Sequence, residues 1–173
     1  GRLGGPAVCG PWLACYLKAR RQVALHAQVT LGGMANNARG VPQDRVQAVI
    51  GYLKVAQQGH VLSKSYLGRM YDYGMGPVQD LAQAVIWYRK AADQEIADAQ
   101  FAVGRIYATD HWSVDVPPDF AQAVVWYRKA AQQGHIQAQV TLGEMYNNGT
   151  GVPQDRVQEV IWYGKAAQQG PGL

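Results

Sequence analysis

The chain has 173 residues, 48% of them hydrophobic, and carries a formal net charge of +4. Its apolar runs are all shorter than the ~20 residues that a membrane-spanning helix needs, so the sequence predicts no membrane span. Two cysteines are too few for the disulfide framework of a small secreted domain, and we expect Cys9 and Cys15 to be free thiols. The sequence does not decide whether the protein is cytoplasmic, periplasmic or secreted.

The N-terminal residues have two interpretations. Arg2 followed by apolar residues up to Leu17 has some features of a signal peptide. Tyr16, however, lies in register with tyrosines further along the chain. We therefore predict a tail over residues 1–11, a half-repeat helix over residues 12–22, and no signal peptide. Because the chain lacks an initiator Met, we expect a fragment or a mature form.

The positive charge is concentrated in the first third of the chain. Residues 1–64 hold eight Lys and Arg against a single Asp, whereas residues 65–173 hold eight against eleven acids. A basic end could bind an anionic polymer through Lys18, Arg20 and Arg21. We favour the simpler interpretation of a solvated end, which leaves nucleic acid as a disfavoured partner.

One motif returns along the chain at an almost constant interval. Residues Trp87–Ala92 read Trp-Tyr-Arg-Lys-Ala-Ala, and the pattern recurs at Trp126–Ala131 and, altered, at Trp162–Ala167. Counted back through Tyr52 to Tyr16, the tyrosine spacings are 36, 36, 39 and 36 residues. A fixed period of this length is typical of a stack of supersecondary units, each of which packs mainly on its neighbours.

Each repeat reads as a pair of helices. In the second unit we predict a first helix from His60 to Asp72, a glycine-containing loop, and a second helix to Gln94 that the Asp80 carboxylate caps. Apolar residues of the second helix recur at three- and four-residue steps, as one buried face requires. His60 and the equivalent His135 are expected to be polar residues at helix starts rather than catalytic bases.

Glycines mark two further positions of the repeat. Gly59, Gly134 and Gly170 are expected to end second helices in the left-handed conformation, whereas Glu95 stands at this position once and predicts a different local connection. An interior glycine costs a helix about 1 kcal/mol relative to alanine. A column of them therefore predicts close packing beneath an aromatic ring, with close approach to a ligand as the alternative. This column holds Gly32, Gly68, Gly104 and Gly143.

The combined pattern resembles the Sel1-like repeat. Its elements are Leu-Gly-x-x-Tyr, as in Leu67–Tyr71, a Gly-x-Gly loop, a capping Asp, and Ala-x-x-Trp-Tyr-x-Lys-Ala-Ala-x-Gln-Gly, as in Ala123–Gly134. The resemblance covers residues 12–170 and implies an all-α protein, a right-handed α-solenoid of antiparallel helix pairs related to tetratricopeptide repeats. It also implies an adaptor role in bacterial complexes. The repeats are expected at 24–59, 60–95, 96–134 and 135–170, followed by a tail over 171–173.

No residue pattern indicates catalysis. Ser63, Ser65 and Ser113 lack the context of an activated nucleophile. The Gly-x-Gly steps lack the preceding strand that a dinucleotide site requires. Some cysteine-rich proteins with this repeat have been connected with penicillin binding and β-lactam hydrolysis, but their repeated cysteine pairs are missing here. We predict no enzyme activity and no cofactor.

An insertion of three residues lengthens one loop, residues 108–118. It places Trp112 beside His111 and two carboxylates, Asp110 and Asp115, a set that could contact a peptide or a sugar. The His and carboxylates could also bind a metal, although their spacing is not diagnostic. In the alternative interpretation, Trp112 packs against its own loop.

A second candidate surface is the face of the first helices away from their Leu and Tyr stripe. In related solenoids this side lines a concave groove, and Lys64, Arg69 and Arg105 would form a basic run along it, suited to an acidic peptide. In the alternative interpretation, these polar residues form an ordinary solvent-exposed helix face that binds no partner. The three columns on this face hold Lys64, Gln100 and Gln139, then Arg69, Arg105 and Glu144, then Asp72 and Asn147.

The sequence thus favours a non-catalytic scaffold that binds a protein segment in this groove, with the loop around His111 and Trp112 as a lateral contact. The first alternative is a cell-envelope protein that binds peptidoglycan and has possible hydrolase activity. The second is a protein that binds anionic polymers through its basic end. The last helix, Arg156 to Gln169, could also self-associate if it is left uncovered.

Overall fold

A computed structural model describes residues 45–75, 78–109 and 116–169 of the chain. The predicted N-terminal tail, the half-repeat, both cysteines and residues 171–173 lie outside these ranges. Within them, all the regular elements are seven α-helices. They are α2 (Arg45–Gln57), α3 (Val61–Asp72), α4 (Leu81–Ala92), α5 (Ala97–Ala108), α6 (Phe120–Gln132), α7 (Ile136–Asn148) and α8 (Arg156–Gln169).

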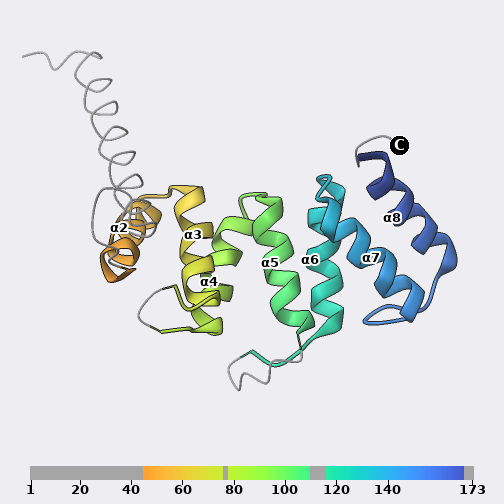
Figure 1. The fold of residues 1–173 in the computed structure, drawn as a ribbon, viewed down its shortest axis with the longest axis horizontal. Helices are drawn as coiled ribbons and strands as arrows, with labels where there is room; N and C mark the ends of the chain where they lie inside the picture. Colours follow the sequence, from red (N-terminus) through yellow and green to blue (C-terminus); the bar gives the residue numbers. More distant parts are fainter. Residues whose placement is uncertain (1–44, 76–77, 110–115, 170–173) are drawn as a thin grey trace, which may run out of the picture.

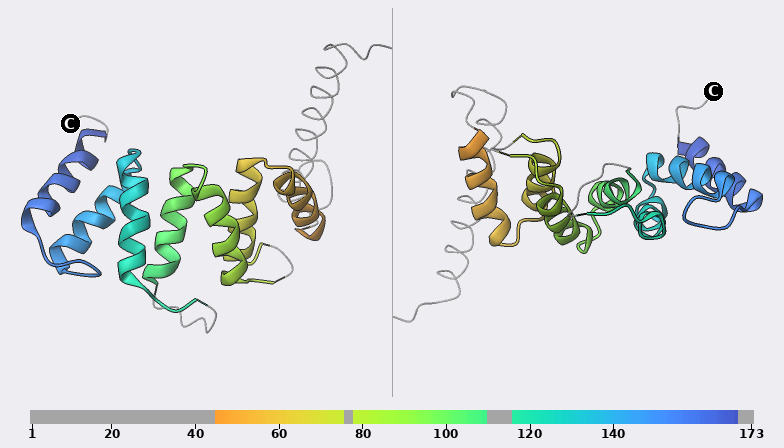
Figure 2. Two further views of the ribbon diagram at one scale, coloured as in Figure 1. Left: turned by 180° about the vertical axis from the view of Figure 1, so that it is seen from behind. Right: turned by 90° about the horizontal axis from the view of Figure 1, so that it is seen from below.

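The helices form a row of hairpins (Figures 1 and 2). The most extensive contacts join α3 to α4, α5 to α6 and α7 to α8, and these hairpins stack through α4 on α5 and α6 on α7. The helix α2 packs on α3 in the same way. The predicted all-α solenoid of helix pairs is confirmed. In the described part of the chain, no helix is both long and apolar enough to cross a membrane.

The helix starts follow the predicted capping residues. The Oδ1 atoms of Asp80 and Asp119 accept hydrogen bonds from backbone N–H groups three residues later, both at 2.9 Å. Asp155 accepts two backbone N–H groups, that of Val157 at 2.9 Å and that of Gln158 at 3.0 Å. His60 and His135 cap the first helices, because the Nδ1 of each accepts the N–H three residues later. The expectation that both histidines mark helix starts is confirmed.

The second helices α2, α4 and α6 end in left-handed residues, whereas Gly170, predicted to end α8, lies outside the described residues. Gly59 and Gly134 have φ values of 95° and 88°. Glu95 has a φ of 61° and makes the same pair of closing backbone bonds, from its own N–H and from that of Ile96. The prediction of a different connection at Glu95 is therefore wrong. The packing of α5 on α4 holds the turn in its usual form, although the residue is not glycine.

The three described glycines of the column lie under tyrosine rings, as predicted, and Gly32 lies outside the described residues. A Cβ added to Gly68 would come within 2.5 Å of the Tyr88 ring, and one added to Gly104 within 2.8 Å of the Tyr127 ring. Gly143 stands in the same relation to Tyr163. Each glycine therefore lets the second helix of its hairpin place a tyrosine flat on the backbone of the first helix.

Candidate functional site

A groove of about 540 Å³ runs between α3 and α5. Eleven of its lining residues come from these helices and the segments beside them, one from α4, and one from the start of α7. They are Leu62, Ser65, Tyr66, Arg69, Tyr73, Met75, Tyr88, Ile96, Asp98, Phe101, Ala102, Arg105 and His135. The groove therefore depends on three successive hairpins and belongs to none of them alone.

Helical spacing brings the two walls together. The α3 wall carries Leu62, Tyr66 and Arg69, which lie at i, i+4 and i+7 and so share one helix face. On the opposite wall, Asp98 and Arg105 of α5 lie seven residues apart and share a face in the same way. Because α3 and α5 are equivalent first helices, the arginines of the two walls occupy equivalent positions.

A buried carboxylate holds Arg105 in place. Asp72, which is 3% exposed, forms an ion pair with the Arg105 guanidinium and accepts a hydrogen bond of 3.3 Å from the Tyr88 hydroxyl. Burial raises the pKa of the Asp72 carboxyl, although Arg105 and the Tyr88 hydroxyl both act to lower it. Burial and the neighbouring Asp72 also raise the pKa of the Tyr88 hydroxyl. Desolvation is therefore the strongest influence on this network.

The two arginines of the groove differ in their availability. The Arg105 side chain is 33% exposed, and its guanidinium carbon lies 5.4 Å from the centre of the Tyr73 ring. Arg69 is exposed, and none of the hydrogen bonds and ion pairs among the described residues involves its guanidinium. Arg69 can therefore give all its donors to a ligand, whereas Arg105 has already committed one edge to Asp72.

The opposite end of the groove is acidic and aromatic. The Asp98 carboxylate, 88% exposed, lies 3.5 Å from His135 Nε2. The His135 ring stacks on Phe101, with their centres 4.6 Å apart. Because His135 Nδ1 accepts a backbone N–H, the neutral ring carries its proton on Nε2, which faces Asp98. The groove is thus cationic at the C-terminal ends of α3 and α5 and anionic at the N-terminal end of α5.

The predicted column of Lys64, Gln100 and Gln139 does not line this groove. Gln100 and Gln139 are each 3% exposed, so their expected surface position is wrong. Their amides donate to the carbonyls of Ala92 and Ala131, at the ends of the preceding second helices. Each of these carbonyls also accepts one backbone N–H of the closing turn, so the glutamine amide supplies its second hydrogen bond and is buried in doing so.

Only some residues of the other two predicted columns line the groove. Arg69 and Arg105 line the groove, while Glu144 is exposed on α7 outside it. Asp72 lies beneath the surface, where it binds Arg105, so its expected exposure is wrong. His111 and Trp112, the predicted lateral contact, lie outside the described residues. The glycan interpretation and the metal set with Asp110 and Asp115 depended on that same loop.

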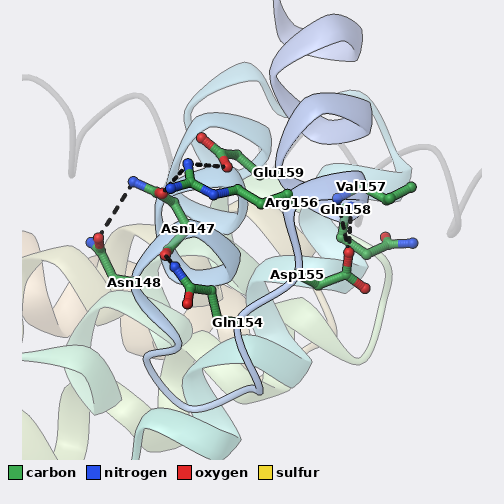
Figure 3. A network of polar contacts seen from close by, with 8 residues as sticks. All are labelled: Asn147, Asn148, Gln154, Asp155, Arg156, Val157, Gln158 and Glu159. Carbon is green, nitrogen blue, oxygen red and sulfur yellow. Dashed lines mark hydrogen bonds and ion pairs between the residues drawn. The ribbon is translucent and has the colours of Figure 1, made fainter.

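Asn147, the counterpart of Asp72, has different partners (Figure 3). Its carbonyl accepts the Gln154 amide at 2.6 Å, just as the Asp72 carbonyl accepts that of Gln79. Its side-chain oxygen accepts Arg156 Nη1 at 2.9 Å, and Arg156 also pairs with Glu159. An arginine from its own hairpin thus serves Asn147, whereas Asp72 is served by an arginine from the next hairpin.

The sequence reasoning missed the aromatic part of the groove. Tyr66 and Tyr73 are 40% and 56% exposed, and Phe101 stands beside Arg105 on α5. Tyr66 also stacks on Tyr52 of α2, at 5.3 Å between ring centres. The spacing of Tyr66, Arg69 and Tyr73 carried the signal, because a three- and four-residue step marks one face. Among the described residues, no group of three His, Cys, Asp or Glu could hold a metal ion.

A row of helical hairpins with a groove between its first helices defines an α-solenoid of the helical-repeat class. More narrowly, the chain belongs to the Sel1 repeat family, whose model matches residues 25–60, 62–95, 97–135 and 136–171. Proteins built from this repeat generally serve as scaffolds for protein–protein interaction. No match was found among curated protein sequences.

Solved structures share the fold. A protective antigen of uropathogenic Escherichia coli strains that displays an SLR fold is 37% identical, with a TM-score of 0.79 over 90% of this chain and 33% of its own. A Sel1 repeat protein from Oxalobacter formigenes is 32% identical, with a TM-score of 0.74 over 85% of this chain and 59% of its own. The chain therefore spans only part of the length of both.

A more distant likeness concerns the fold alone. An immunity protein from Pseudomonas aeruginosa is 17% identical to this chain and has a TM-score of 0.50. The match covers 96% of this chain and 77% of that protein. At this identity the likeness shows a shared fold and says nothing about what this chain binds.

Proposed function

We propose that the protein is a non-catalytic scaffold that binds a segment of a partner protein along the groove between α3 and α5. The observation that carries this proposal is the polarity of the groove. Arg69 and Arg105 lie at one end, Asp98 at the other, and Tyr66 and Phe101 at the level between them. A cleft with aromatic walls and a few converging charges has the make-up of a specific binding site.

The arginine end selects the chemistry of the segment. Guanidinium groups bind carboxylates with two parallel hydrogen bonds, which a lysine cannot reproduce. The exposed donors of Arg69 make it the first contact, and the fixed position of Arg105 gives a second donor with little entropy left to lose. We expect a segment with a carboxylate at this end and an apolar or aromatic side chain against Tyr66 and Phe101.

The test measures binding of fluorescent peptides from an array in which acidic and aromatic positions are varied. Arg69→Glu should weaken the best binder by at least about tenfold, because a charge-assisted contact is worth about 1.5–3 kcal/mol. Arg89→Glu is the matched control, since Arg89 is also exposed but lies on α4 outside the groove. Arg105 is unsuitable for this test, because its loss would strand the Asp72 carboxylate.

Two results would contradict the proposal. One is an array in which no peptide binds the wild-type protein above background. The other is binding that Arg89→Glu weakens as much as Arg69→Glu does, which would show that net charge matters and the groove does not. A variant at the apolar level, Tyr66→Ala, separates these effects, because it leaves the charge unchanged and should weaken only peptides that carry an apolar or aromatic residue at this level.

A further inference from the structure

The anionic end of the groove has binding capacity that the groove itself does not use. Asp98 lies in the first turn of α5, whereas Arg69 and Arg105 lie in the last turns of α3 and α5. The Asp98 carboxylate is 88% exposed, and its Oδ1 lies 3.5 Å from His135 Nε2. Its Oδ2 takes part in none of the hydrogen bonds and ion pairs among the described residues. A carboxylate oxygen is therefore available to a cation at the end of the groove opposite the arginines.

The middle of the groove offers fixed apolar surface. The Phe101 ring is stacked on His135, with centres 4.6 Å apart, and lies 5.4 Å from the Tyr127 ring. On the α3 wall, Tyr66 is 40% exposed and stacks on Tyr52. Because neighbouring rings hold both side chains, little rotamer freedom is lost when an apolar side chain packs between them.

The arrangement of charges occurs once among the described first helices. The position of the groove arginines is occupied, in chain order, by Arg69, Arg105 and Glu144. The cationic end therefore does not continue onto α7. At the position of Asp98, α3 carries Leu62 and α7 carries Gln137. This part of the chain thus suits one discrete segment better than a long polymer of like charges.

The length of α5 sets the spacing of the ligand's charges. Asp98 and Arg105 are seven residues apart, which corresponds to about 10.5 Å along a helix. An extended chain covers this distance in about three residues, at roughly 3.3 Å each. A helix of the same length and a diameter of 10–12 Å would fill roughly 800–1,200 Å³. The groove, at about 540 Å³, therefore fits an extended segment better than a helical one.

The alternation of an extended chain agrees with the two walls. Successive side chains point to opposite sides, so residues three apart face opposite walls. Arg69 belongs to the α3 wall, and Asp98 belongs to the α5 wall. A carboxylate at one position can therefore meet Arg69 while a cation three residues away meets Asp98. The two residues between them lie at the level of Tyr66 and Phe101.

We propose that the ligand is a short extended segment of a partner protein in which a carboxylate and a cationic side chain stand three residues apart, with apolar residues between them. The cation is a further requirement that rests on the function proposed above, and Asp98 is the residue that selects it. A segment with acidic residues alone would bring a like charge to Asp98. This repulsion disfavours purely acidic segments in the groove.

A peptide series in which one arginine changes position tests the spacing. Each fluorescent peptide holds one glutamate and otherwise apolar and neutral residues, with the arginine one to seven residues away on either side. Both chain directions are thereby covered. Affinity for the wild-type protein should be greatest at a separation of three residues. Replacement of that arginine by citrulline, which keeps the shape without the charge, should weaken binding about two- to fivefold, as expected for an exposed ion pair.

The variant Asp98→Asn tests which residue selects the cation. It should bind the arginine and citrulline peptides equally, because the partner of the charge is gone. Glu144→Gln is the matched control, since Glu144 is exposed on α7 outside the groove and its replacement removes the same charge. This control should keep the preference for arginine. Thermal unfolding of both variants checks that they are folded at the temperature of the binding assay.

Three results would overturn the cation requirement. The wild-type protein could bind citrulline peptides as tightly as arginine peptides, its affinity could be greatest at another separation, or Glu144→Gln could lose the preference as Asp98→Asn does. If binding in these cases still depends on Arg69, the proposed function stands without the cation. If no peptide binds, or if Arg69→Glu leaves binding unchanged, both the proposed function and the cation requirement are wrong.

Discussion

Asp72 of α3 and Arg105 of α5 form an ion pair across two hairpins, with the carboxylate buried and the guanidinium at the groove surface. The pair joins the walls of the groove and fixes one of its two cationic groups. Because the guanidinium also lies over Tyr73, its position is constrained from two sides. The pair is therefore both a structural link and part of the candidate binding site.

The two partners of this pair should respond unequally to replacement. Arg105→Met leaves a buried carboxylate without its cation and should lower the free energy of unfolding by about 2–4 kcal/mol at neutral pH. Asp72→Asn leaves a partly solvated arginine and should cost about 1 kcal/mol. Urea denaturation of both variants and the wild type measures the difference. If both variants lose the same free energy of unfolding, desolvation of the Asp72 carboxylate is not the main energetic cost at this pair.

The Arg105→Met variant should also depend on pH in a defined direction. Burial raises the pKa of the folded Asp72 carboxyl, and loss of the arginine removes an influence that lowers it. A folded pKa above the unfolded value means that stability is retained at low pH and lost as the pH rises through the folded pKa. The deficit relative to wild type should therefore shrink as the solution is acidified. Double replacement, with Asp72→Asn added, should abolish this dependence.

Two helix glycines should give opposite results when changed to alanine. In Gly104→Ala the new Cβ would lie 2.8 Å from the Tyr127 ring, so the variant should lose about 1–3 kcal/mol. In Gly164→Ala the Cβ meets no atom within 4 Å, and the gain in helix propensity should stabilise the protein by up to about 1 kcal/mol. Thermal unfolding at low protein concentration measures both, and a stable Gly104→Ala protein would refute the ring-on-backbone contact.

Glu95 offers a stabilising change. Its φ of 61° costs a non-glycine residue free energy that a glycine avoids, so Glu95→Gly should raise the free energy of unfolding by up to about 1 kcal/mol. Asp93 is the matched control, since it is exposed, lies two residues away and has a φ of −67°. Asp93→Gly should destabilise the protein by about 0.5–1 kcal/mol. Chemical denaturation that ranks the two variants in the reverse order would count against the turn geometry.

Tyr127 should make the fold sensitive to alkali. Burial raises the pKa of its hydroxyl to about 12. A raised folded pKa contributes stability below the unfolded pKa of about 10 that is lost as the pH rises towards 12, by about 2–3 kcal/mol in total. Tyr127→Phe should unfold with a flatter dependence on pH across this interval. Stability curves that run parallel in the two proteins would show that the hydroxyl is not desolvated.

The repeat period was sufficient to predict the helix pairs. Spacing and capping residues are local signals, so Asp80, Asp119 and His135 could be placed at helix starts from the sequence alone. The glycine column was predictable for a related reason: an interior glycine is costly and needs a packing partner. At Glu95 the residue type misled, because the stacking of neighbouring hairpins overrides the preference of a single turn residue.

The groove was only partly predictable. Arg69 and Arg105 were found because charges repeat at one helix position, and the structure puts both at the same end of the groove. Gln100 was misplaced because sequence polarity cannot distinguish an amide that faces water from one that donates to a buried carbonyl at a helix end. Tyr66 and Phe101 were missed because an aromatic residue in a repeat is normally core. Only the position of the next hairpin decides whether it stays exposed.

The glutamine links also imply an order of unfolding. Gln133 and Gln169 donate hydrogen bonds to the side chains of Gln100 and Gln139, which in turn donate to carbonyls of the preceding hairpin. A chain of hydrogen bonds between amide groups therefore links the hairpins at the α4–α5 junction and at the α6–α7 junction. At the junction of α2 with the hairpin of α3 and α4, Lys64 stands in place of the glutamine and cannot accept such a bond. A solenoid opens from its weakest junction. Amide protons of α2 should therefore exchange before those of α6, and the groove should survive that first opening.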